Sequence, residues 1–169
     1  MRKLTLFLAL VAFTISAHAQ SVESSKIRAG AGLVYATDIN NLGLAFKGVY
    51  SFTPEWEGAI GFTHIFKKDY ISYNVVDLDA QYIFSHSGDQ ISFFAIGGLA
   101  INMWKVDFPE EWGFGYFGGG STTGSDIGLN LGAGMNYELS SNLRLVPEVR
   151  FTLLEGSYAR IGATVQYAF

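Results

Sequence analysis

The chain of 169 residues has no cysteine and few charged residues, and both absences narrow what it can be. Without cysteine it forms no disulfide, no thiolate metal site and no cysteine nucleophile. Charged residues make up 15% of the chain, against about 25% in typical domains. A net charge of -4 argues against nucleic acid as a partner, because phosphate binding needs a basic surface. Hydrophobic residues make up 49%, which argues against a disordered chain.

The first 19 residues have the pattern of a secretory signal peptide. Arg2 and Lys3 form a positive segment, and residues 4–15 form an apolar stretch. That stretch is shorter than the about 20 residues that a transmembrane helix needs. Ala17 and Ala19 flank His18 as a small-x-small cleavage site, so we predict cleavage after residue 19 and export of the rest. An uncleaved membrane anchor is the alternative.

After Lys26 the sequence contains no apolar run of membrane-helix length. The longest run, residues 93–101, has nine residues and includes two glycines. The pattern is instead alternation of apolar with small or polar residues, clearest over 126–139, and this is the period of a β-strand. A tilted strand needs about 9–11 residues to cross a bilayer. The alternation predicts strands over 26–36, 42–53, 56–66, 72–84, 90–104, 126–139, 143–154 and 159–169.

Short turns and generally longer loops alternate between these predicted strands. The short turns are 53–55, 85–89 and 140–142. In outer-membrane barrels such turns are periplasmic and the longer loops are extracellular. Pro147, inside a predicted strand, removes one ladder hydrogen bond and predicts a β-bulge. The longer loops are 37–41, 67–71, 105–125 and 155–158.

The two faces of the strands differ in a way that favours a membrane barrel. The apolar faces end in aromatic residues, as the girdles of membrane barrels do. The opposite faces mix glycine and alanine with charges, which suits a narrow interior filled by side chains. A soluble exported barrel, with its polar face outside, is the alternative. The charges predicted to form a paired polar network in the lumen are Arg28, Lys47, Glu57, Asp77, Asp79, Glu138, Arg144, Glu148, Arg150 and Arg160.

The mature chain, residues 20–169, resembles the small eight-stranded outer-membrane barrels of the OmpA/OmpX-like superfamily of Gram-negative bacteria. Besides the signal peptide, the segments that carry the resemblance are 128–134, 147–151 and 165–169. The resemblance implies an all-β, closed, antiparallel, up-and-down transmembrane barrel in the bacterial outer membrane, in contact with lipopolysaccharide and without a cofactor. The alternation of Val165, Tyr167 and Phe169 resembles the signal read by the barrel-assembly machinery. The superfamily hosts many roles, so the activity stays open.

The predicted loop 105–125 differs most from the alternating pattern of the chain, and we predict that it is extracellular. Aromatic residues among glycines suit an adaptable binding surface, since Tyr and Trp dominate many interfaces. The alternative is a surface loop whose aromatic residues rest on the barrel rim. The candidate binding residues are Phe108, Trp112, Phe114, Tyr116 and Phe117.

Catalysis is not expected. His64 falls on the outward face near Phe62 and Phe66, and His86 falls in a short turn. Neither histidine has the nearby nucleophile and orienting group that acyl transfer needs, and two distant histidines make a poor metal site. We therefore predict no catalytic residue and no metal, and a structural or surface-binding role. A small passive or gated pore is the main alternative, and a lipid A-modifying enzyme is less favoured.

The face assignment makes a prediction about substitutions. Arginine in place of Leu131 or Val149 is expected to cost about 2–4 kcal/mol at the bilayer midplane. Alanine in place of the inward-facing Asn130 is expected to matter much less.

Overall fold

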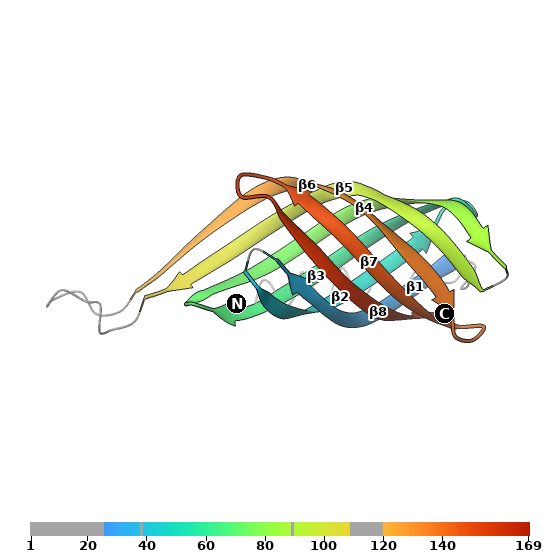
Figure 1. The fold of residues 1–169 in the computed structure, drawn as a ribbon, viewed down its shortest axis with the longest axis horizontal. Helices are drawn as coiled ribbons and strands as arrows, with labels where there is room; N and C mark the ends of the chain where they lie inside the picture. The colour runs from blue at the N-terminus through green and yellow to red at the C-terminus, as the bar shows by residue number, and fades with distance from the viewer. Residues whose placement is uncertain (1–25, 38, 89, 109–119) are drawn as a thin grey trace, which may run out of the picture.

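The computed structural model describes residues 26–37, 39–88, 90–108 and 120–169. These residues form a closed barrel of eight strands, in which each strand is antiparallel to its neighbours in the sequence (Figure 1). In the described part of the chain, no helix has the length and hydropathy to cross a membrane. The strands are β1 (Ile27–Ala36), β2 (Asn41–Ser51), β3 (Trp56–Lys68), β4 (Ile71–Ser87), β5 (Ile91–Asp107), β6 (Ser121–Glu138), β7 (Leu143–Leu153) and β8 (Tyr158–Ala168).

Pairing of the first strand with the last closes the sheet. β1 pairs with β8 from Arg28 opposite Ala168 to Ala36 opposite Arg160. Every strand therefore has two partners, and no edge is left with unpaired backbone groups. The predicted all-β, up-and-down, eight-stranded architecture is confirmed.

The alternation of the two faces is also confirmed. Large apolar side chains such as Leu33, Ile127 and Leu131 lie exposed on the outside, whereas polar side chains of the same strands, such as Arg28 and Asn130, are buried inside. Successive residues of a strand point to opposite faces. Every second residue therefore faces outward and the residues between them face inward, and we call this alternation the parity of a residue.

The connections define two ends of the barrel. We call the end with residues 52–55, 88–90 and 139–142 the turn end, and the end with the other four connections the loop end. The prediction of a longer loop over 67–71 is wrong. β3 and β4 are joined by only Asp69 and Tyr70, both with positive φ (48° and 68°). A two-residue hairpin turn requires positive φ at both positions, and the absence of glycine there concealed it.

The predicted loop 105–125 is shorter than expected. β5 continues to Asp107 and β6 begins at Ser121, and Lys105 pairs with Thr123. The alternation disappears in these added residues because neither of their faces is strongly apolar, although the backbone pairing continues. Figure 1 shows this hairpin projecting beyond the other strands at the loop end.

The bulge predicted at Pro147 is wrong. The β6–β7 register is the same on both sides of the proline, and only the pairing of Met135 and Asn136 with β7 is interrupted. The register shifts lie between Ile65 and Lys68 and between Ile83 and Ser85. The barrel accommodates the proline by omitting ladder contacts rather than by inserting a residue.

One interior glycine lets β1 and β8 approach closely, and this predicts a stability effect. A Cβ atom on Gly32 would lie 1.9 Å from the carbonyl oxygen of Ala163 on β8. Gly32→Val is therefore expected to cost about 1–3 kcal/mol of unfolding free energy, by overpacking. Gly97→Val is the matched control, because a Cβ there meets nothing within 4 Å. Urea unfolding should show little change for the control; equal losses in both variants would contradict the close-approach explanation.

Candidate functional site

The middle of the barrel interior holds three cations and three carboxylates in direct contact. We call Lys47, Asp77, Asp79, Glu148, Arg150 and Arg160 the central charge cluster. The formal charges cancel within it. Burial of charge is tolerated only when each charge is paired and hydrogen-bonded. Every charge of this cluster has a partner of opposite charge, although the Nε atom of Arg160 has no hydrogen-bond acceptor among the described residues.

Arg150 on β7 contacts all three carboxylates of the cluster. Its Nη1 lies 2.8 Å from Asp79 Oδ2 and 3.4 Å from Asp77 Oδ2, and its Nη2 lies 2.7 Å from Glu148 Oε2. Glu148 also pairs with Lys47. The guanidinium fork thus joins β4 to β7 across the interior, and the lysine extends the cluster to β2.

Arg160 on β8 donates two hydrogen bonds to the carboxylate of Asp77. Its Nη1 and Nη2 donate to the Oδ2 and Oδ1 atoms of Asp77 at 2.8 and 2.7 Å. Nη2 also lies 3.2 Å from Thr152 Oγ1. Bidentate arginine–carboxylate pairs combine strength with fixed geometry, so this contact sets the position of β8 relative to β4.

Asn130 on β6 lies at the centre of these groups, and the geometry does not support the small effect expected for its replacement. Its Nδ2 donates to Asp77 at 2.8 Å and to Asp79 at 3.0 Å. Its Oδ1 accepts from Thr152 at 2.8 Å and from Arg160 at 3.3 Å. Parity alone placed Asn130 inside, but it could not reveal how many buried groups depend on this amide.

Asn130→Ala is now expected to lower the unfolding free energy by about 2 kcal/mol, because it leaves buried groups without partners. The matched control is Asn136→Ala on the same strand. Asn136 is equally buried but makes a single side-chain bond, from Nδ2 to Ser92 Oγ at 3.1 Å. Urea titration of the folded protein in lipid vesicles measures both. A cost for Asn136→Ala as large as that for Asn130→Ala would contradict the central role of Asn130.

The remaining predicted lumen charges form two separate pairs toward the turn end. Arg28 donates two hydrogen bonds to Glu57, at 2.6 and 2.8 Å, and both residues are buried. Arg144 pairs with Glu138 at 2.8 Å, but their side chains are 26% and 39% exposed, so this pair belongs to the rim. The ten charges are therefore arranged as three groups, not as one network.

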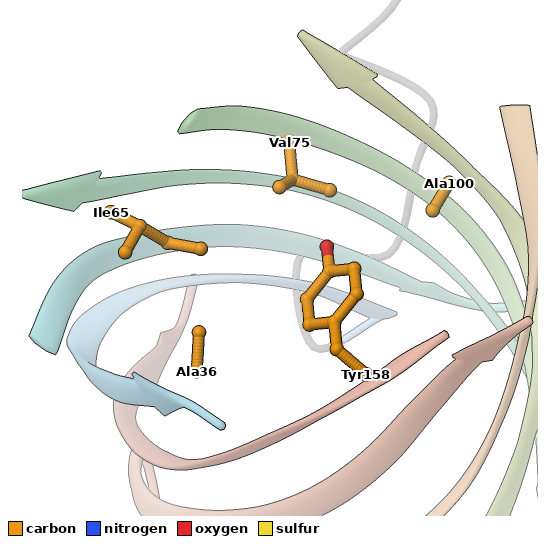
Figure 2. Packing of buried hydrophobic residues seen from close by; sticks show 5 residues of the cluster. All are labelled: Ala36, Ile65, Val75, Ala100 and Tyr158. Atoms are coloured by element: carbon orange, nitrogen blue, oxygen red, sulfur yellow. The ribbon is translucent and has the colours of Figure 1, made fainter. Parts of the chain in front are cut away.

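Apolar layers lie above and below the central charge cluster. The loop-end plug consists of Ala36, Ile65, Val75, Ala100 and Tyr158, whose side chains point into the barrel from five strands (Figure 2). The turn-end plug consists of Ile83, Phe94, Ile96 and Val146. Sequence analysis missed both plugs, although the sequence carried a signal, because apolar residues such as Ile65, Phe94 and Val146 stand at inward-facing positions of their strands.

The interior is packed rather than hollow. The cavity that reaches Lys47, Asp77 and Arg160 has a volume of about 40 Å³, whereas sites for small molecules occupy about 300–1,000 Å³. A substrate therefore has little room beside the central charge cluster.

The predicted binding loop is described only in part. Phe108 is exposed, and its N–H donates to the carbonyl of Gly120 at 2.8 Å. The other four candidates, Trp112, Phe114, Tyr116 and Phe117, lie outside the described residues. Next to the loop, Asp107 forms ion pairs with Lys67 at 2.8 Å and with Lys105 at 2.7 Å.

The outer face carries the predicted aromatic residues, the assembly residues and His64. Aromatic pairs near the turn end include Trp56 with Tyr82, at a centroid distance of 4.9 Å, and Tyr167 with Phe169, at 5.5 Å. Val165 is exposed on the same face of β8. His64 Nδ1 lies 2.8 Å from the amide oxygen of Asn74, so its partner is neither a hydroxyl nor a carboxylate. Within the described ranges, no group of three or more His, Cys, Asp or Glu residues could hold a metal ion.

Comparisons with protein-family models and with curated protein sequences find no match. Comparison with solved structures finds small barrels. The N-terminal β-barrel domain of Pseudomonas aeruginosa OprF is 18% identical, with a TM-score of 0.65 over 86% of this chain and 98% of that one. Neisserial surface protein A is 17% identical, with a TM-score of 0.65 over 85% and 96% of the two chains.

Ail, the attachment invasion locus protein of Yersinia pestis, is also similar in structure. It is 18% identical, with a TM-score of 0.59 over 85% of this chain and 96% of that one. A second structure holds Ail in complex with the heparin analogue sucrose octasulfate. At these identities the likeness concerns the fold, which is a small closed antiparallel barrel.

Proposed function

We propose that this protein is an integral outer-membrane barrel that binds a partner through its loop end and performs no catalysis. The observation that carries the proposal is the distribution of residues between the two faces. Leucine, isoleucine and phenylalanine side chains cover the outside, whereas the buried charged residues include Arg28, Asp77, Asp79, Arg150 and Arg160. Monomeric soluble proteins rarely expose apolar patches of more than a few hundred Å², and a hydrocarbon environment removes that difficulty.

The proposed orientation of the barrel in the membrane follows from its connections. The turn end would face the periplasm and the loop end the cell exterior, as in other outer-membrane barrels. Residues 1–19, which lie outside the described residues, would direct export as a cleaved signal peptide. Val165, Tyr167 and Phe169 would be read by the barrel-assembly machinery, and lipopolysaccharide would surround the loop end.

The packed interior favours a structural lumen over a pore or an active site. Two apolar plugs enclose the central charge cluster, and its charges are all used in pairs. An eight-stranded barrel is just wide enough for side chains to fill it. We therefore expect no conductance when the folded protein is placed in planar bilayers; steady conductance would support the pore instead.

Binding at the cell surface is the role that the loop end supports best. The similar structures include Neisserial surface protein A and Ail, which is called the attachment invasion locus protein. The rim of this barrel differs from a polyanion site, because Asp107 pairs with both Lys67 and Lys105. The described lysines of this rim, Lys67, Lys68 and Lys105, are outnumbered by the carboxylates of Asp69, Asp107, Asp126 and Glu155, so the proposed partner is not a polyanion.

The first test is membrane fractionation followed by gel electrophoresis. We expect the protein to stay in the outer-membrane fraction after a urea wash. We also expect the unheated sample to run differently from the boiled one in SDS, because a closed barrel resists unfolding. Release by urea, or identical mobility with and without heating, would refute the membrane proposal and favour the soluble exported barrel.

A further inference from the structure

A pocket of about 200 Å³ opens inside the barrel mouth at the loop end. Its wall includes Tyr73, Asn102, Trp104, Asp126, Glu155 and Tyr158. Tyr158 lines this pocket and also belongs to the loop-end plug, whose side chains Figure 2 shows, so we place the plug at the floor of the pocket. The pocket is thus closed toward the central charge cluster and is separate from it.

Asn102 brings an unused hydrogen-bond donor to this pocket. The residue is only 3% exposed. The hydroxyl of Tyr158 donates to its Oδ1 atom, which orients the amide. The Nδ2 group has no partner among the described residues. A buried donor without an acceptor is unfavourable, so a ligand atom that accepts from Nδ2 would stabilise the site.

Trp104 and Asp126 form the adjoining wall. The indole Nε1 of Trp104 donates to Asp126 Oδ2 at 3.1 Å, and this bond holds the ring in place. Trp104 stands opposite Gly124 on β6, where a Cβ atom would lie 2.2 Å from the ring. The glycine therefore provides the space that the indole occupies. Within the described ranges, Asp126 and Glu155 have no ion-pair partner, so both carboxylates can accept from a ligand.

The pocket is smaller than the about 300–1,000 Å³ of sites for drug-sized molecules, so its occupant is limited to about a single ring. We infer that this pocket binds one ring of a neutral saccharide. A sugar hydroxyl can accept from Asn102 Nδ2 and donate to a carboxylate, whereas an organic cation offers no acceptor to the amide. An anion would be repelled by Asp126 and Glu155. The indole and phenol rings supply flat apolar surfaces for the C–H face of a sugar. The inference rests on the proposed surface-binding role and gives that role a ligand class.

The test measures the binding of methyl glycosides of glucose, galactose, mannose and N-acetylglucosamine to the folded protein in lipid nanodiscs, by ligand-observed NMR. We expect saturable binding of at least one glycoside. Asn102→Leu, which removes the donor, should weaken it at least fivefold, and Trp104→Ala should weaken it at least tenfold. Trp56→Ala is the control, because Trp56 lies on the outer face and should leave the affinity unchanged. The gel shift on heating establishes that each variant is folded.

The outcomes separate this inference from the proposed function. Folded protein that binds no glycoside, or that binds choline instead, would overturn the saccharide site. Glycoside binding that is insensitive to both pocket substitutions would overturn it as well. None of these results affects the membrane proposal, which depends on urea extraction and the gel shift. Loss of the gel shift in the unaltered protein would instead remove the outer-membrane role on which the inference rests.

Discussion

Arg150→Met is expected to lower the free energy of unfolding by about 3–5 kcal/mol, because it leaves buried carboxylates without their partner. Arg150 contacts Asp77, Asp79 and Glu148, and the remaining Lys47 and Arg160 cannot balance three negative charges. Methionine keeps much of the volume, so the cost reports the lost charge more than a cavity. Urea titration in lipid vesicles, followed by tryptophan fluorescence, measures the effect.

Two further variants show whether burial is the cause. Arg144→Met removes an arginine from the partly exposed pair with Glu138 and should cost at most about 1 kcal/mol, as exposed pairs do. Arg150→Met combined with Asp79→Asn restores charge balance and should recover about 1–2 kcal/mol of the loss, since the two side chains are in contact. Equal costs at positions 144 and 150 would show that the interior is more open to water than the structure indicates.

The fold could be predicted from the sequence because a barrel is specified mainly by parity. Over residues 126–138, one apolar residue in every two determines which side chains face out, and neighbouring hairpins repeat the pattern. The proposed membrane location requires closure, because a strand in hydrocarbon cannot leave backbone groups unpaired. Pairing of β1 with β8 is therefore the expected consequence of eight strands with that pattern.

The structure differs from the sequence-based predictions where the alternation of apolar and polar residues carries no information. Thr122 and Thr123 continue β6 beyond the region where the outside is apolar, so no contrast between the faces marks them as strand. Phe94 and Ile96 point inward although they are apolar, because an interior that is sealed at both ends needs apolar layers as well as ion pairs. A period-two pattern assigns each residue to the outer or the inner face. It does not show which inward-facing residues of different strands lie at the same height in the barrel.

The candidate sites show the same limit. The charges of the lumen could be identified one by one, but their division into a central charge cluster and two separate pairs depends on the register between strands. The mouth pocket was missed because Asn102 and Asp126 are far apart in the sequence and become cross-strand neighbours only in the β5–β6 ladder. The signal that could have found them was the inward parity shared by Asn102 and Trp104.

Leu131→Arg is the substitution that discriminates most sharply between a membrane barrel and a soluble one. Leu131 follows Asn130, so it lies at the height of the central charge cluster, and its side chain is 55% exposed on the outer face. In a bilayer, arginine at mid-height is expected to cost about 2–4 kcal/mol, and near the interface about 0–1 kcal/mol. Thr123→Arg, on the exposed outer segment of the same strand, is the matched control.

The contrast between these two variants depends on the medium around the barrel. If hydrocarbon surrounds the outer face, Leu131→Arg should assemble poorly into vesicles and unfold at lower urea concentration, whereas Thr123→Arg should behave like the unaltered protein. If water surrounds it, an arginine at position 131 would replace an exposed leucine and would be neutral or favourable for solubility. A neutral Leu131→Arg would therefore refute the membrane proposal even if the barrel itself folds, because the interior contacts of Asn130 and Arg150 do not depend on what lies outside.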